Sequence, residues 1–161
     1  MMRIFLIFLA TFIIFVGIAL NYAKAFRVKN KIIDIIEQNE GILDIDIPDT
    51  DESSGGPIKS INNYLQYINY DVVDDHNYVN SDLCSSKINN SLYNVIYYSN
   101  ERGYCIGRYI VPEDERHVSS VAEEYYEVVT FVIIKIPMFD DLVYPIPIRG
   151  ETRKIERIEN S

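Results

Sequence analysis

The sequence has few of the residues from which catalytic and metal sites are usually built. It contains no tryptophan, two histidines, two cysteines and seven glycines. His76 and His117 each fall in a predicted loop without a nucleophile motif beside them. No cysteine or histidine spacing suits zinc, and Gly55-Gly56 lacks the Lys-Ser/Thr pair of a phosphate-binding loop. We therefore expect no enzyme activity, no cofactor and no metal. A hydrolase remains an alternative only if a cleft converges on one of the histidines.

Acidic residues are missing from the first 31 positions, although the whole chain is acidic. Five basic residues occur there, namely Arg3, Lys24, Arg27, Lys29 and Lys31. Because the formal net charge of the chain is −9, the remaining residues sum to −14. An acidic domain repels the phosphates of DNA and RNA, so we expect no nucleic-acid partner. The basic residues suit anionic lipid head groups, so we expect a lipid bilayer as a partner.

No charged residue lies between Ile4 and Leu20, and almost every residue in this run is apolar. As an α-helix, the run is roughly 25 Å long at 1.5 Å per residue, which nearly matches a bilayer core of about 30 Å. We therefore predict that residues 1–21 form a transmembrane segment or signal anchor. Residues 22–161 then form one small domain.

The same helix is predicted to continue over residues 22–40, because no proline or glycine interrupts it. On a helical wheel this half is amphipathic. Its apolar packing face is predicted to contain Tyr22, Ala25, Phe26, Ile32, Ile33 and Ile36. Lys29 falls on the same face, where its ammonium can reach water by snorkelling. We expect the rest of the chain to cover this face.

The orientation of the chain across the membrane depends on two opposing features. The basic residues after the apolar run favour the cytoplasm for the side that carries them. Cys84 and Cys105 favour the opposite side, because an even pair in a small domain can form a disulfide in an oxidising compartment. An N-terminal apolar run also usually exports the part that follows it. We expect a single-pass protein of the cell membrane with an extracytoplasmic C-terminal domain and a Cys84–Cys105 disulfide. The alternative is two buried thiols that never meet.

A cleaved signal peptide is the alternative to a retained anchor. Ala23-Lys24-Ala25 has the small-x-small pattern of a cleavage site, so cleavage after Ala25 is possible. The apolar run is longer than the about 7–15 residues usual in a secretory signal, so we expect retention.

The remaining segments predict an α+β fold. We expect an acidic loop over 41–56, a short helix over 57–69 and an antiparallel sheet over 92–158. Its strands are predicted at 92–98, 104–111, 125–136 and 142–149, with a short one within 152–158. Pro145 and Pro147 lack donors on the same side of their strand, which places that strand at the sheet edge. The 13 tyrosines fit packing at the sheet margins better than stacking on sugars.

A membrane rod followed by a sheet that its apolar face can cover resembles the plan of type IV pilins. The chain is similar to TadE-like pseudopilins and related small envelope proteins of Gram-positive bacteria. The similarity rests on the apolar run, Asn21-Tyr22, residues 29–37, Gly103-Tyr104-Cys105, residues 125–131 and Gly150-Glu151-Thr152. It implies a non-catalytic, pilin-like structural subunit whose partners are other pilin-like or envelope-assembly subunits. The alternative is a secreted or surface-exposed binding module released by cleavage at Ala25.

Overall fold

The computed structural model describes residues 2–43, 56–70, 79–88, 92–118, 121–135 and 143–158. In chain order these ranges contain α1 (Met2–Gln38), α2 (Pro57–Tyr67), α3 (Ser81–Lys87), β1 (Asn94–Ser99), β2 (Tyr104–Ile110), the 3-10 helix η1 (Glu113–Glu115), β3 (Val121–Lys135), β4 (Val143–Glu151) and β5 (Ile155–Ile158). The fold is α+β, as predicted, with a long N-terminal helix and a five-stranded antiparallel sheet. Most of the predicted acidic loop, and His76, lie outside the described residues.

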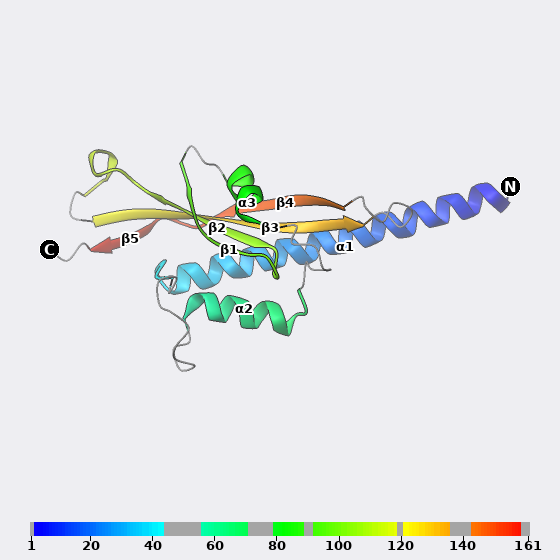
Figure 1. Ribbon diagram of the computed structural model, residues 1–161, viewed down its shortest axis with the longest axis horizontal. Helices are drawn as coiled ribbons and strands as arrows, with labels where there is room; N and C mark the ends of the chain where they lie inside the picture. The colour runs from blue at the N-terminus through cyan, green and yellow to red at the C-terminus, as the bar shows by residue number, and fades with distance from the viewer. Residues whose placement is uncertain are drawn as a thin grey trace.

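Helix α1 is unbroken over 37 residues, as the lack of proline predicts. It ends at Gln38, and the backbone then turns through Glu40 and Gly41, both with positive φ. The N–H of Gly41 donates to the carbonyl of Ile36 at 2.9 Å, a bond typical of a glycine-terminated helix. Figure 1 shows the N-terminal half of α1 projecting beyond the sheet, while its second half lies along one sheet face beside α2.

Helix α3 was not predicted from the sequence. It covers the sheet face opposite α1 (Figure 1), and it begins at Asn80, whose side chain accepts a hydrogen bond from the N–H of Leu83. Such an N-cap compensates for donors that the first helical turn leaves unpaired. Asn80-Ser81-Asp82 carries this signal in the sequence.

The strand order is β1-β2-β3-β4, and β5 pairs with the first part of β3. Strand β3 begins at Val121, four residues before its predicted start, because β5 supplies a partner for residues 121–124. Strand β4 pairs only with β3 and is an edge strand, as its prolines predict. The N–H of Phe131 donates to Gly103, on the β2 side, so the nitrogen of its β4 partner Pro147 faces away from β3.

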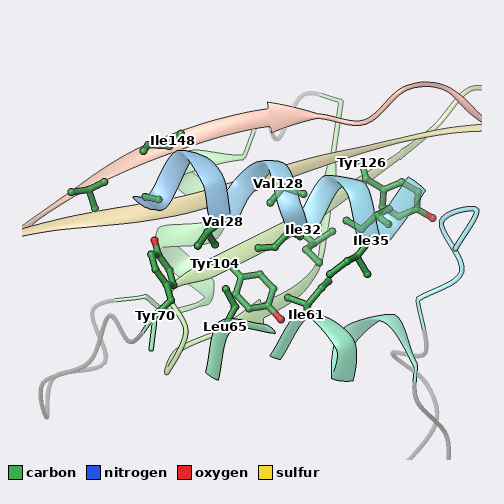
Figure 2. Close-up of a cluster of buried hydrophobic side chains, with 14 of the residues drawn as sticks. Val28, Ile32, Ile35, Ile61, Leu65, Tyr70, Tyr104, Tyr126, Val128 and Ile148 are labelled. Atoms are coloured by element: carbon green, nitrogen blue, oxygen red, sulfur yellow. The ribbon is translucent and has the colours of Figure 1, made fainter. Parts of the chain in front are cut away.

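Two hydrophobic clusters lie on the two faces of the sheet. The larger one joins α1 and α2 to the sheet (Figure 2), and its fully buried members include Val28, Ile32, Ile36, Ile61, Leu65, Tyr104, Ile106 and Val128. The smaller one lies under α3 and contains Val79, Cys84, Ile88, Tyr93, Cys105, Val129 and Phe131. Because both faces are covered, β3 is apolar on both sides, as expected for a central strand.

The predicted packing face of α1 is wrong at two of its four principal positions. Ile36 is fully buried and Ile33 is half-buried against the core, but Tyr22 and Phe26 are 51% and 43% exposed. The buried side chains are Ala25, Val28, Lys29, Ile32, Ile35 and Ile36. At 100° per residue, their face is rotated by roughly 60° from the predicted one. The small side chain of Ala25 allows a close approach to the sheet that an aromatic ring would prevent.

Candidate functional site

The N-terminal half of α1 carries apolar side chains that the domain leaves largely uncovered. Apart from Ile18, which is half-buried, the exposed fractions of its large apolar residues run from 39% at Val16 to 74% at Ile4. Among the described residues, α1 is the one helix long and apolar enough to span a membrane, with a mean hydropathy of 2.7. An α-helix rises roughly 31 Å between Arg3 and Lys24, close to the ~30 Å core of a bilayer. This half of α1 therefore fits a transmembrane segment or signal anchor.

The second half of α1 is held against the sheet at short range. The Thr130 hydroxyl donates to the carbonyl of Ala25 at 3.2 Å, and both residues are buried. Gly150 lies under the same helix, where a Cβ atom would be 2.6 Å from Lys29 Cδ and 2.8 Å from Ile33 Cδ1. The absence of a side chain at position 150 therefore leaves room for the ends of the Lys29 and Ile33 side chains.

Lys24 connects the start of the packed half of α1 to the end of α2. Its ammonium donates to the carbonyl of Asn69 at 2.8 Å and lies 5.6 Å from the centre of the Tyr70 ring. The Tyr70 hydroxyl in turn donates to the carbonyl of Phe131 at 2.9 Å. These contacts place the end of α2, the start of the packed half of α1 and the second half of β3 at the same level.

Lys29 is buried rather than extended into water as predicted. It is 8% exposed, and its ammonium lies 4.4 Å from the centre of the Phe26 ring. Burial lowers the pKa of Lys29 below its ordinary value. The exposed Phe26 ring therefore forms a cation–π contact with this ammonium at the margin of the packed face.

A buried polar cluster fixes the other end of α1. The Tyr126 hydroxyl lies 2.8 Å from the carbonyl of Gly41 and 2.6 Å from Glu124 Oε2, so its single proton serves one of these acceptors at a time. Arg157 donates to the same hydroxyl at 3.2 Å and forms an ion pair with Glu124. Burial, followed by the neighbouring Glu124 carboxylate, raises the pKa of Tyr126 to about 12. This cluster joins the turn after α1 to β3 and β5.

A second buried carboxylate, Glu123, lies beside this cluster on β3. Lys154 donates to it at 3.1 Å, and the backbone N–H of His117 donates to the same oxygen at 3.3 Å. The hydrogen bond from Lys154 is the main reason that the pKa of Glu123 lies below its ordinary value. The His117 side chain is 82% exposed, 3.6 Å from Glu123. The charges of this region are thus paired within the fold.

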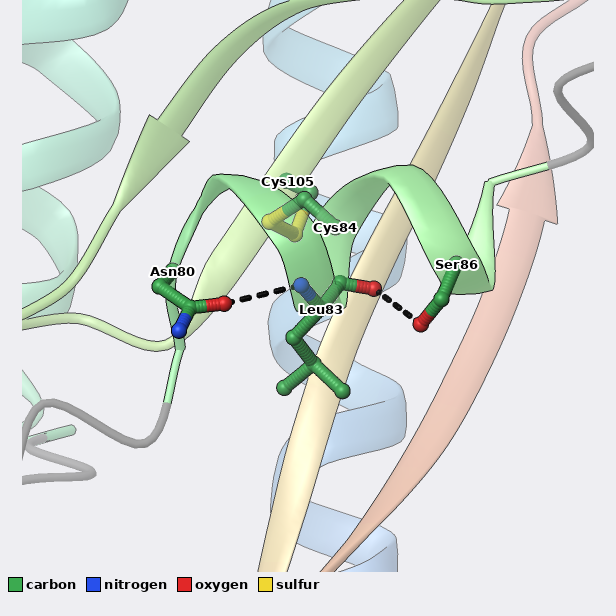
Figure 3. The surroundings of a disulfide bond; sticks show 5 residues. All are labelled: Asn80, Leu83, Cys84, Ser86 and Cys105. Atoms are coloured by element: carbon green, nitrogen blue, oxygen red, sulfur yellow. Dashed lines mark hydrogen bonds between the residues drawn. A yellow bond between two sulfur atoms is a disulfide. The ribbon is translucent and has the colours of Figure 1, made fainter.

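Cys84 and Cys105 form the predicted disulfide between α3 and β2, with their Cα atoms 5.8 Å apart. Both residues are fully buried, and Figure 3 shows the bridge beside the short helix α3, which the Asn80 cap begins. The Ser86 hydroxyl donates to the carbonyl of Leu83 within the same helix. The bridge therefore attaches a helix of only seven residues to the sheet. Cys105 has no thiol to offer as a nucleophile.

The open cavities among the described residues include three that tyrosine side chains line. One of ≈ 500 Å³ lies between α2 and the β1–β2 turn and includes Tyr97 and Tyr98. One of ≈ 350 Å³ adjoins Tyr126, and one of ≈ 340 Å³ adjoins Tyr93 and Glu127. His117 lines none of these three, so they do not form the cleft that a hydrolase built on this histidine would need. Within the described ranges, no group of three or more metal-ligating side chains is found.

The sequence identified the apolar half of α1 and the two cysteines, but it missed the residues that join α1 to other elements. These residues donate hydrogen bonds to backbone carbonyls 45 to 105 positions away in the chain. The pairs are Lys24 with Asn69, Tyr126 with Gly41 and Thr130 with Ala25. No local pattern marks such pairs. Comparison with protein-family models, with curated proteins and with solved structures found no match to this chain.

Proposed function

We propose that this protein is a membrane-anchored, pilin-like structural subunit of an envelope or pilus-type assembly and that it has no catalytic role. The observation that carries the proposal is one continuous helix with two different environments. Its first half is apolar and uncovered, whereas its second half belongs to the core of an α+β domain. A helix shared in this way fixes a domain directly to a membrane segment without a linker.

The packing of Ala25 supports retention of the anchor over cleavage after this residue. Ala25 is 1% exposed, and its carbonyl accepts the hydrogen bond from Thr130. Cleavage would end the helix inside the core and create an ammonium group on Phe26, next to the buried face. Burying an unpaired charge is costly. A domain built around an intact helix through Ala25 is therefore better suited to a retained anchor than to a released module.

The disulfide supports an extracytoplasmic position of the domain in this proposal. Disulfides persist in oxidising environments and are rare where thiols are kept reduced. In the proposed arrangement, the anchor holds the acidic domain on the outer side of the cell membrane. Helices of neighbouring subunits then associate side by side through their apolar halves. Within a bilayer such association depends on close packing rather than on exclusion of water.

The anchoring proposal is tested on the full-length protein in its native cells. We expect it to remain in the membrane fraction after alkaline carbonate washing, with an N-terminus that precedes the apolar run. A thiol reagent that cannot cross membranes is expected to label Cys84 and Cys105 in intact cells only after reduction. A mature N-terminus at Phe26 contradicts retention, and labelling only after cell lysis contradicts the extracytoplasmic position.

Subunit association is tested with one added cysteine, since the two native cysteines are joined to each other. Nothing within the fold lies within 4 Å of a Cβ atom placed at Gly17, and this small residue permits close helix contact. We expect Gly17→Cys to yield disulfide-linked dimers in membranes after mild oxidation. Phe15→Cys, roughly on the opposite side of the helix, serves as the matched control. Equal cross-linking of both variants would contradict a specific helix contact.

A further inference from the structure

The cavity of ≈ 350 Å³ beside Tyr126 has a basic lining, although the domain around it is acidic. It lies where the chain turns after α1, and its lining includes Gly41, Tyr126, Arg108 from β2 and Arg157. Figure 1 shows this end of α1 on the side of β5 and far from the N-terminus. The cavity therefore lies at the end of the domain opposite to the N-terminal half of α1.

Arg157 is paired within the fold and is a fixed part of this lining. Its guanidinium forms an ion pair with Glu124 at 3.4 Å, and its Nε donates to the carbonyl of Glu40 at 3.2 Å. It also donates to the Tyr126 hydroxyl at 3.2 Å. These contacts hold the guanidinium at the cavity, and the buried Glu124 carboxylate compensates its positive charge.

Arg108 supplies a second guanidinium, whose charge is not compensated in this way. The residue pairs with Tyr126 across β2 and β3, and it is half-buried. Burial raises the pKa of the Tyr126 hydroxyl, and the nearby positive charge of Arg108 is among the groups that oppose this rise. Within the described ranges, the Arg108 guanidinium has no hydrogen bond or ion pair. The cavity therefore has one positive charge that these residues leave unpaired.

The remaining lining of the cavity is aliphatic and consists of Ile42, Leu43 and Ile96. Leu43 and Ile96 are partly buried against the main hydrophobic cluster, whereas Ile42 is 55% exposed. One unpaired charge beside aliphatic side chains suits an organic monoanion. Inorganic phosphate fits less well, because it has no apolar part to bury. A guanidinium binds a carboxylate through two parallel N–H···O bonds.

We infer that this cavity binds a carboxylate adjoining an apolar group, as at the C-terminus of a peptide that ends in leucine. Arg108 donates to the carboxylate, and the apolar group of the ligand lies against Ile42, Leu43 and Ile96. The inference does not depend on the proposed anchoring, because every residue that lines the cavity belongs to the folded domain.

The test uses the full-length protein in micelles of an uncharged detergent and isothermal titration calorimetry. The probe is acetyl-Ala-Ala-Leu with a free carboxylate. We expect it to bind, and we expect the same peptide with a C-terminal amide to bind about tenfold more weakly or worse, because it lacks the charge. Acetyl-Ala-Ala-Gly is expected to bind about tenfold more weakly, because it has no apolar side chain to bury. Hexanoate is titrated as a carboxylate without a peptide group.

Arg108→Gln removes the unpaired charge and keeps a side chain of similar length. We expect it to reduce the affinity for the peptide acid about tenfold or more, to the level of the amide. Arg27→Gln is the matched control, because it removes the same charge from an exposed residue that precedes the end of α1 by roughly 16 Å. This control is expected to bind the peptide acid as the parent protein does.

Equal binding of the peptide acid and its amide overturns the inference, as does binding of neither the peptide acid nor hexanoate. Equal losses in Arg108→Gln and Arg27→Gln also overturn it, because binding then depends on net charge alone. Asp44 and Asp46 follow Leu43 outside the described residues. Binding that appears only after Asp44→Asn and Asp46→Asn overturns the inference, because the chain's own carboxylates then fill the cavity. Tighter binding of the peptide acid than of hexanoate supports a peptide C-terminus as the ligand, and the reverse order supports a free carboxylic acid.

Discussion

Replacing Ile32 with alanine tests which face of α1 the sheet covers. Ile32 is fully buried and belongs to the cluster that joins α1, α2 and the sheet. The substitution removes about three methylene equivalents at ~0.8 kcal/mol each and leaves a cavity. Because α1 is held to neighbouring elements on both sides of Ile32, we expect these elements not to collapse into the cavity. The expected loss in free energy of unfolding is about 3–4 kcal/mol.

Phe26→Ala on the same helix is the matched control. Phe26 is 43% exposed, and its ring contacts the Lys29 ammonium. Losing that contact is expected to cost about 1 kcal/mol. Both variants are compared with the parent protein by urea unfolding in detergent micelles, followed by the near-ultraviolet circular dichroism of the tyrosines. The slope of the free energy of unfolding against urea concentration should be the same in both variants as in the parent protein.

The reasoning is refuted if Phe26→Ala destabilises the domain as much as Ile32→Ala does. That result would mean that the packed face is the one predicted from the sequence, centred nearer Tyr22 and Phe26. A loss below about 1 kcal/mol for Ile32→Ala would mean that α1 is not an essential part of the core.

Three further predictions concern the disulfide, the end of α1 and the buried Tyr126. The Cys84→Ser/Cys105→Ser double variant should lose about 3 kcal/mol in thermal or urea unfolding, because the bridge closes a loop across a sequence separation of 21; an unchanged stability would contradict this. Gly41→Ala should cost about 1 kcal/mol or more, because Gly41 has φ +68° and an added Cβ would lie 2.7 Å from the Tyr126 ring. Gly17→Ala, where the Cβ meets nothing within 4 Å, should leave unfolding unchanged. The pKa of Tyr126 is raised in the fold from 10.0 to about 12, so the stabilisation from this group is complete below pH 10 and is lost as pH rises toward 12. Stability measured across this range should fall less steeply in Tyr126→Phe, and an identical pH dependence would exclude Tyr126 as a cause.

The sequence predicted the elements whose signals are local. Helix α1 follows from an apolar run and a continuation without proline, and the edge position of β4 follows from Pro145 and Pro147. The β1–β2 hairpin follows from two β-prone runs joined through Gly103. In each case, nearby residues determine the backbone conformation, so no knowledge of distant partners is needed.

The parts that were missed depend on residues far apart in the chain. Glu123 and Glu124 do not look like strand residues, yet they extend β3 because Lys154 and Arg157 pair with them after the chain returns as β5. The rotation of the α1 face arises in a similar way, since the sheet reaches Ala25 through Thr130 and approaches closely at Gly150. A helical wheel ranks side chains by polarity and cannot show that small ones are required at a close contact. The orientation of the domain and its partners stay predictions.

The unbroken backbone of α1 also determines how the domain moves. Its only glycine, Gly17, lies in the uncovered half, and the helix has no break or hinge between that half and the part that packs on the sheet. If the proposed anchor leans by about 10°, the far end of the packed half, roughly 21 Å beyond Lys24, sweeps sideways by about 4 Å. A rotation of α1 about its own axis would likewise turn a different side of the sheet toward the neighbouring subunits of the proposed assembly. The orientation of the domain would thus be set by the tilt and rotation of α1 inside the bilayer.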